Sequence, residues 1–204
     1  MGNNKVKDDL ALNYFFRFFG YGNPESPLWF IGIEEGGASG GIPAVDSHSS
    51  ITLSSGTYHF DPNLPCESGA AKSPLWAKYR NISMRAGNGP NYFMSNMAPL
   101  ARPSIKNVLP DNVSWPAYRK LVAKERIPAL KSLIQHFQPR AVLFHGKAAW
   151  RDYGVRETFG LQTLSGELHV YPNERLLFSP FLLRGFSNEN RDRAVDLLGD
   201  WLRK

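Results

Sequence analysis

Four short apolar segments are spaced along the chain, and each ends in residues typical of turns. They are PLWFIG (27–32), NYFMSN (91–96), RAVLFHG (140–146) and ERLLFSP (174–180). Short, nearly continuous apolar runs bounded by Gly, Asn or Ser-Pro are typical of strands that are covered on both faces. The pattern therefore predicts four buried strands.

Helical spacing is clearest in two other segments. The C-terminal segment carries an apolar stripe of Ala194, Val195, Leu197, Leu198, Trp201 and Leu202. Ser187 or Asn188 precedes this stripe as a candidate N-cap. Residues 114–137 have similar spacing, although Pro128 should kink that helix or restart it at its first turn. Two long amphipathic helices are expected.

The alternation of strands and helices decides the expected fold class. Residues 8–19 are also predicted to be helical, and another helix is expected to begin over residues 148–153. Such alternation implies right-handed crossovers and a parallel sheet with both faces covered. We predict an α/β fold, a three-layer α/β/α sandwich around a central four-stranded parallel sheet. Residues 1–204 are expected to form a single domain.

Residues 36–75 differ from the rest of the chain because they are rich in Gly, Ser and Pro. Only a short strand near 50–60 is expected within them. A loop of this length inside a compact domain is usually functional.

The net charge of +6 is unevenly distributed. Residues 1–70 contain 3 Lys and Arg against 8 Asp and Glu, whereas residues 71–204 contain 21 against 10. A basic surface on the later part of the chain favours a polyanionic partner such as DNA. The alternative is a solvated surface without a partner.

Cysteine content and hydropathy exclude several classes of protein. The single cysteine, Cys66, cannot form an internal disulfide and leaves too few thiolates for a cysteine-based metal or iron–sulfur site. Metal-binding histidine spacings are also missing, so no metal or other cofactor is expected. No apolar run approaches the ~18 residues of a membrane span, and the N-terminal residues lack a signal-peptide core. We expect a cytoplasmic protein that does not associate with membranes.

Candidate chemistry lies where the predicted strands end. Ligand sites of open α/β sheets lie outside the carboxyl ends of the parallel strands. Those ends bring together Glu34, Glu35, Asn96, His145 and Ser179. A carboxylate placed there can stabilise a developing positive charge and orient water, and an amide can form a bidentate pair with a nucleobase edge.

Each of these residues also has a structural alternative. Adjacent side chains diverge, so only one of Glu34 and Glu35 is expected to enter the site, and both could be solvated turn residues. Asn96 could simply form a turn. His145 is a candidate general acid or a buried, hydrogen-bonded imidazole, and His48 and His59 are alternative acids.

The segment SPFLLRG (179–185) is a candidate DNA-contacting loop. It presents the apolar residues Phe181, Leu182 and Leu183 beside Arg184, between a proline and a glycine. Apolar side chains can wedge into a base stack while an arginine contacts phosphate. Alternatively, the apolar residues could belong to the core.

Taken in order, the strand ends resemble the uracil-DNA glycosylase superfamily. GIEEG (32–36) is similar to the first motif, G-x-D-P-Y or G-x-N-P-G, and YFMSNMAPLARP (92–103) is similar to the strand whose asparagine binds the flipped base. RAVLFHGKAAW (140–150) is similar to the third strand and its helix, and FSPFLLRG (178–185) to the H-P-S or H-P-A motif. The resemblance covers the chain from about residue 28 onward.

The resemblance implies particular roles. Glu34 stands at the position of the catalytic Asp or Asn, Asn96 at that of the base-binding asparagine, and Ser179 at that of the histidine that stabilises the departing base. Glu35 replaces a proline. The aromatic residue that stacks on the base is not identified, and three aromatic residues are candidates for it: Tyr58, Phe60 and Trp76.

The implied activity is excision of a flipped base by hydrolysis of its N-glycosidic bond, which leaves an abasic site. The altered motifs and the small-residue segment 37–57 point to a modified base, such as a bulky cytosine derivative of phage DNA, and so to antiviral defence. The expected partner is DNA at the nucleoid, with no obligate protein partner. The expected DNA contacts are Arg184, Phe181, Leu182, Leu183, Lys147 and Arg102.

The sequence also allows other functions. One is a uracil-specific repair enzyme, and another is a catalytically inactive relative that binds DNA. A hydrolase of free nucleosides and a structural module without DNA affinity are also considered.

Overall fold

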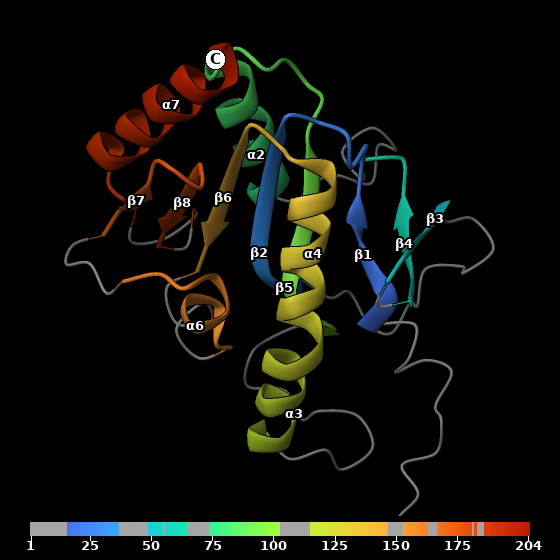
Figure 1. Cartoon of the computed structure of the whole chain (residues 1–204). Coiled ribbons are helices and arrows are strands. Elements are labelled where there is room, and N and C mark those ends of the chain that lie inside the picture. The colour runs from blue at the N-terminus through green and yellow to red at the C-terminus, as the bar shows by residue number, and fades with distance from the viewer. Residues whose placement is uncertain are drawn as a thin grey trace, which may run out of the picture.

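The structure is a computed structural model with one mixed sheet at its centre (Figure 1). It describes residues 16–36, 49–54, 56–64, 74–102, 115–146, 153–162, 167–180, 182 and 186–204, without the side chains of 34–36, 49, 99–102 and 115.

Within these described residues, eight strands form the sheet, in the order β3-β4-β1-β5-β2-β6-β8-β7. Their bounds are β1 (Phe18–Tyr21), β2 (Leu28–Gly36), β3 (Ser49–Leu53), β4 (Gly56–Asp61), β5 (Phe93–Arg102), β6 (Ala141–His145), β7 (His169–Tyr171) and β8 (Leu176–Ser179). The neighbours β5, β2, β6 and β8 are mutually parallel, whereas β1 runs antiparallel to β5 and β7 antiparallel to β8.

The predicted α/β class is confirmed, but the predicted sheet was wrong in size and type. The four apolar segments do form strands, namely β2, β5, β6 and β8. Further strands extend the sheet on both sides and make it mixed. The short strand expected near residues 50–60 is confirmed, and it is in fact the antiparallel pair of β3 and β4.

The helix predicted over residues 8–19 differs from the structure at its last two residues, since residues 16 and 17 are helical but β1 begins at Phe18. Residues 18–21 form a strand that pairs with β4 and β5, and residues 1–15 lie outside the described part. Gly20 shows why tertiary contact decides the outcome, because its φ is +142° and an added Cβ would lie 1.9 Å from the main-chain oxygen of Met94. Such a close backbone approach is specific to the folded sheet and leaves no periodic signal.

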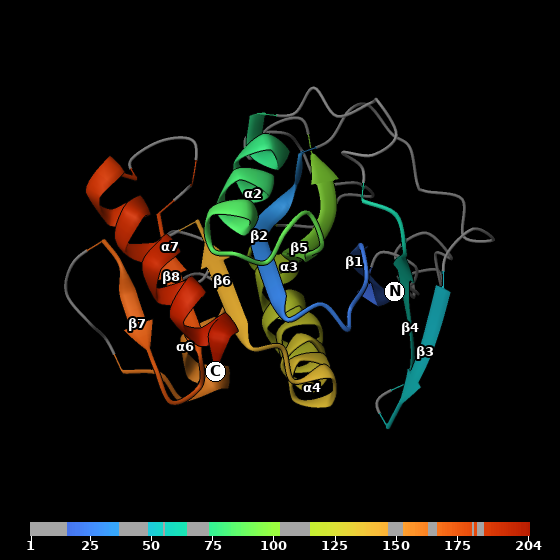
Figure 2. The ribbon, with the colours of Figure 1, turned by 90° about the horizontal axis from the view of Figure 1, so that it is seen from above.

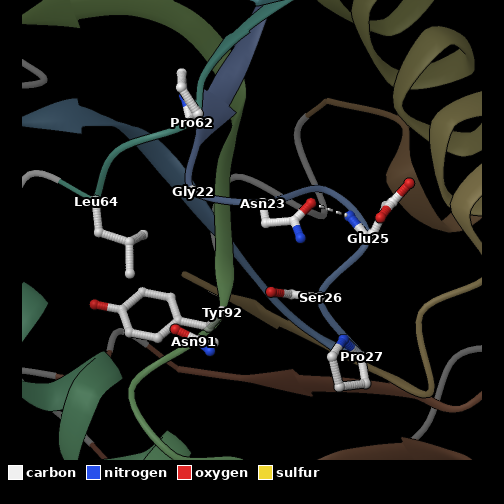
Figure 3. A pocket seen from close by; sticks show the side chains of 9 residues that line it. All are labelled: Gly22, Asn23, Glu25, Ser26, Pro27, Pro62, Leu64, Asn91 and Tyr92. Carbon is white, nitrogen blue, oxygen red and sulfur yellow. Dashed lines mark hydrogen bonds between the residues drawn. The ribbon is translucent and has the colours of Figure 1, made fainter.

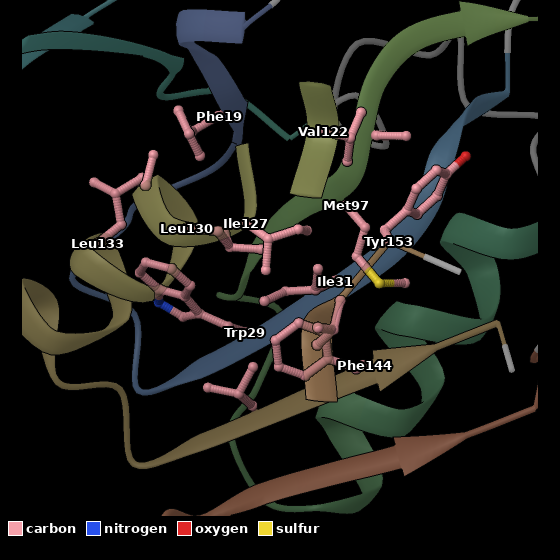
Figure 4. Packing of buried hydrophobic residues seen from close by; sticks show 14 of the residues in the cluster. Phe19, Trp29, Ile31, Met97, Val122, Ile127, Leu130, Leu133, Phe144 and Tyr153 are labelled. Atoms are coloured by element: carbon pink, nitrogen blue, oxygen red, sulfur yellow. The ribbon is translucent and has the colours of Figure 1, made fainter. Parts of the chain in front are cut away.

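Helices cover both faces of the sheet (Figure 2). Their bounds are α2 (Pro74–Arg85), α3 (Trp115–Leu121), the π-helix η4 (Val122–Arg126), α4 (Ile127–Phe137), α6 (Val155–Phe159) and α7 (Asn188–Arg203). Side chains of β2 alternate between two cores: Leu28 and Phe30 pack with α2 and α7, whereas Trp29 and Ile31 pack with η4 and α4. Figure 4 shows the second of these cores.

The helix predicted over residues 114–137 is confirmed, together with its restart near Pro128. The proline lies at the start of α4, immediately after the π-helical turn η4. In that turn the N–H of Ile127 donates to the oxygen of Val122, five residues earlier. The wider turn inserts one residue into the helix and so changes which side chains face the sheet.

The C-terminal helix α7 is also confirmed. Ser187 is its N-cap, and its side chain accepts a hydrogen bond from the N–H of Asn190 at 3.2 Å. The helix α2 was missed. The helix expected from residue 148 falls mainly outside the described residues, and α6 begins later, at Val155.

Candidate functional site

A row of residues crosses the four parallel strands at the level where β6 and β8 end, while β2 and β5 continue beyond it. It consists of Asn96 on β5, Gly32 on β2, His145 on β6 and Ser179 on β8, which we call the strand-end row. Gly32 pairs with Asn96, and His145 pairs with Ser179. Strand alternation directs all of them to the face covered by α2 and α7, because their neighbours Phe30, Leu143 and Leu177 belong to that core. The sequence-predicted Asn96, His145 and Ser179 therefore lie together.

Gly32 is the point over which two polar side chains meet. A Cβ added at this residue would lie 2.9 Å from Oδ1 of Asn96 and 3.2 Å from Nε2 of His145. The amide and the imidazole thus approach the same position from the strands on either side of β2. Glycine is needed because these side chains occupy the space that a larger residue would fill.

His145 is fully buried and hydrogen-bonds through Nε2 to the hydroxyl of Tyr79 on α2. Burial lowers the pKa of His145 to about 3 and raises the pKa of Tyr79 far above its usual range. At neutral pH both members of the pair are therefore uncharged. This imidazole can accept or donate a hydrogen bond, but it carries no surplus proton for general acid catalysis.

Tyr79 is the member of the site that sequence analysis missed. Its ring stacks on Phe30 at a centroid distance of 4.7 Å and meets Tyr92 edge-on at 6.2 Å. A signal was present: Ser73 and Pro74 form a typical helix start, and Leu75, Tyr79 and Ile82 follow at helical spacing. Trp76, one turn before Tyr79, is half-buried against the same core.

Ser179 is buried at the end of β8, and its hydroxyl donates to the main-chain oxygen of Pro180 at 3.0 Å. Gly146, the residue that follows β6, donates its N–H to the oxygen of Ser179. Gly146 has a φ of +101°, and a Cβ there would lie 2.1 Å from the side chain of Ile33. The exit of β6 therefore requires glycine.

Glu34 and Glu35 were predicted at a turn, and that part of the prediction was wrong. Both lie within β2, which continues to Gly36 because it remains paired with β5. Glu34 pairs with Ala98, so its backbone lies two residues beyond Gly32 and Asn96. Asn96 likewise does not end its strand, since β5 continues to Arg102.

Two aromatic candidates lie on the wrong face of the sheet to meet Asn96. Tyr58 is buried in the core beneath η4 and α4, where it meets Phe19 edge-on at 4.9 Å. Phe60 packs against the same core and meets Phe93 edge-on at 6.4 Å. Because side chains alternate along β4, knowing that a strand existed did not reveal which face these rings would take.

Other predicted residues are separated from the row or lie outside the described part. Leu182 was predicted as a DNA wedge but is buried with α7 in the core, so it contributes to packing instead. His59 lies on β4, and its pKa is lowered by burial and by Arg17. Arg102 is described in its backbone only. The predicted residues outside the description are His48, Lys147, Phe181, Leu183 and Arg184.

A cavity of about 390 Å³ lies at the opposite, amino-terminal edge of the parallel strands (Figure 3). Its lining consists of Gly22, Asn23, Glu25, Ser26, Pro27, Pro62, Leu64, Asn91 and Tyr92. Oδ1 of Asn23 accepts a hydrogen bond from the N–H of Glu25 at 2.9 Å, so this side chain is hydrogen-bonded within its own turn. We refer to this hollow as the amino-edge cavity.

Comparison with known proteins adds no family. No family model matches the chain, and no curated protein matches it. Within the described residues, no group of three or more His, Cys, Asp or Glu side chains could hold a metal ion. None of the described helices has the length and apolar character needed to cross a membrane.

Proposed function

We propose that the chain is a DNA glycosylase that flips a modified base out of DNA and hydrolyses its N-glycosidic bond. The observation that supports this most strongly is the strand-end row, which gathers an amide, an imidazole and a hydroxyl on one face of four adjacent parallel strands, at the level where β6 and β8 end. Helices on both faces of these strands agree with the three-layer glycosylase-like sandwich that the motifs resemble.

Asn96 is the proposed base-binding residue. Its amide offers one acceptor and two donor hydrogens, which allows a bidentate contact with the edge of a flipped base. It remains partly exposed beside the buried His145. Specificity would follow because a base with the wrong edge would leave this amide unpaired.

Glu34 is the proposed catalytic carboxylate, with Glu35 as the alternative. As the bond between C1′ and the base nitrogen breaks, its electron pair leaves with the base and positive charge develops on the sugar. A carboxylate would stabilise that charge and orient the water that adds to C1′. The position of Glu34 along β2, just beyond Gly32, is suited to such a role.

The leaving base would be stabilised by hydrogen bonding rather than by a charged acid. His145 is neutral at physiological pH because burial lowers its pKa to about 3. The departing anion would take its proton from water. Ser179, in place of the family's histidine, would serve as a neutral neighbour of His145 across the β6–β8 pair.

A bulky cytosine derivative of phage DNA is the proposed substrate, because the family's motifs are altered and segment 37–57 is rich in small residues. Phosphate would be contacted by the basic residues Lys147, Arg102 and Arg184, with Phe181 and Leu183 beside them. Trp76 is the remaining candidate for stacking on the base. A cytoplasmic location at the nucleoid belongs to the same proposal.

The decisive test is release of abasic sites from single-stranded and duplex DNA that carries uracil, mismatched thymine or hypermodified cytosine. Release from hypermodified cytosine is expected. Glu34→Gln should lower the rate by about a hundredfold or more while DNA affinity is retained. Glu25→Gln, at the exposed amino edge, is the matched control and should leave the rate unchanged.

A second candidate function is a catalytically inactive DNA-binding protein. It is favoured by the engagement of Nε2 of His145 with Tyr79. Salt-sensitive DNA binding without release from any substrate would support this candidate and overturn the glycosylase proposal. Release from uracil alone would instead overturn the bulky-base specificity.

A further inference from the structure

Arg126 is a buried arginine on the face of the sheet opposite the strand-end row. Only 2% of it is exposed, and it occupies the last position of the π-helix η4. Burying a guanidinium removes it from water, and this is tolerated only when its donors are satisfied by good hydrogen bonds. Its partners therefore show which part of the structure it holds.

Two hydrogen bonds of this guanidinium go to Asn96. Nε and Nη2 both donate to the main-chain oxygen of Asn96, at 3.3 and 3.1 Å. Nη1 donates to the main-chain oxygens of Phe18 and Phe16, at 2.6 and 3.4 Å. The guanidinium thus joins the start of β1 to β5 at the residue that we propose binds the base.

The register of the sheet shows where the guanidinium of Arg126 lies relative to β1 and β5. β1 and β5 are paired at Tyr21 and Met94, and the same antiparallel register continued by two residues places Phe19 opposite Asn96. Cζ of Arg126 lies 3.6 Å from the centroid of the Phe19 ring, so the guanidinium is stacked as well as hydrogen-bonded. This fixes both its plane and its distance from the strand.

The π-helical turn places the arginine at this level of the sheet. One inserted residue rotates the following positions of a helix by about 100° relative to an uninterrupted α-helix. The hydrogen bond from the Ile127 N–H to the Val122 oxygen closes the turn, and Arg126 immediately precedes Ile127. π-turns of this kind often lie at functional sites.

We infer that Arg126 is a positioning residue that sets the orientation of Asn96 for base recognition. It acts from the opposite face of β5 by holding the Asn96 carbonyl. The expected effect of Arg126 on base release rests on the proposed glycosylase function, whereas the orientation of the Asn96 amide can be measured without it.

The test compares Arg126→Lys and Arg126→Met with Lys131→Met. Lys131 lies on α4, donates to the main-chain oxygen of Thr158 at 2.8 Å and lies over the Phe159 ring, so it provides a similar contact away from Asn96. The readouts are the NMR resonances of the Asn96 side-chain amide, identified by their loss in Asn96→Ala, and the kcat and KM for base release.

Arg126→Met is expected to shift or broaden the Asn96 amide resonances and to lower kcat by about tenfold or more, with KM nearly unchanged because phosphate contacts dominate affinity. Arg126→Lys should recover part of both losses, and Lys131→Met should change neither. A folded Arg126→Met with unchanged amide resonances would overturn the inference. Unfolding of Arg126→Lys while Lys131→Met stays folded would also overturn it, because global stability would then be the role of Arg126.

If the unaltered protein releases no base from any DNA, the proposed function fails, and the amide resonances alone decide the positioning role. If the unaltered protein releases a base and Arg126→Met does not change kcat for that release, the proposed function stands and the positioning inference fails. The two failures are therefore distinguishable.

Discussion

The two edges of the parallel strands differ in how their polar groups are used. At the amino edge a cavity of about 390 Å³ is lined by turn residues, and Asn23 hydrogen-bonds the backbone of its own turn. Toward the carboxyl edge, Asn96 and His145 come from different strands and meet over Gly32, and Ser179 lies beside His145 on the next strand. A hollow alone is therefore weaker evidence of function than convergence of side chains from distant parts of the chain.

The largest effect is expected from removing the Asn96 amide at the carboxyl edge, and removal of an amide at the amino edge is the control. Asn96→Ala should reduce base release by about a hundredfold, because the base edge would lose its bidentate partner. Asn91→Ala, just before the same strand at the amino-edge cavity, should leave the rate within about twofold of the unaltered protein. Rates of abasic-site formation provide the measurement, and equal losses for both variants would refute the assignment of the carboxyl edge.

A second prediction concerns acid stability, which should depend on the buried carboxyl-edge histidine. The folded-state pKa of His145 is about 3, below the 6.5 of an unfolded histidine. The unfolded state therefore binds more protons between these values, so the stabilising effect is complete above pH 6.5 and is lost as pH falls toward 3. From pH 7 to 5 this amounts to about 2 kcal/mol of unfolding free energy.

Urea unfolding at the two pH values measures this loss. His145→Gln should remove most of the pH dependence even if the variant is less stable overall, whereas His136→Gln, at an exposed position of α4, should retain it. An unchanged pH dependence in His145→Gln would show that another group is responsible.

A third, smaller effect is expected from Gly32→Ala. The added methyl group would lie 2.9 Å from Oδ1 of Asn96, so the amide must shift by a few tenths of an ångström or more. Loss of alignment should lower base release by about tenfold, with a stability cost of about 1 kcal/mol. Gly199→Ala on α7, where a Cβ would meet the Ala86 oxygen at 3.3 Å, tests crowding away from the row and should not alter the rate.

The sequence predicted which segments form the central parallel strands, because a short apolar run is a local property, but it placed the ends of β2 and β5 too early. The apolar run before Gly32 and the one before His145 both form the central strands predicted for them, and parallel strands must bring such ends together. Asn96 and Ser179 were found by the same argument. The residues that lie opposite Asn96 and Ser179 depend on the register of the strands. Apolar runs that are covered on both faces do not specify that register.

The missed features depend on tertiary contact. Phe18 and Phe19, the first two residues of β1, were assigned to the end of a helix because their aromatic side chains also fit helical spacing, whereas the close approach of Gly20 to Met94 is apparent only in the sheet. Tyr58 was one of three candidates for stacking on the base because it is aromatic, but the face that its side chain takes follows from the pairing of β4 with β1 and β3. Arg126 gave no signal as a core residue, because arginines are almost always exposed unless paired.

The smallest predicted effect concerns the turn at the amino edge. Asn23→Ala should lose the hydrogen bond from the Glu25 N–H and destabilise the protein by about 0.5–1 kcal/mol, because that turn would lose its side-chain acceptor. The rate of base release should stay unchanged, since the turn lies before β2 begins at Leu28, away from Gly32. Urea unfolding and the abasic-site assay on the same sample separate the two quantities. A fall in rate larger than the fall in stability would make the amino-edge cavity part of the active site and would remove the distinction between the two edges.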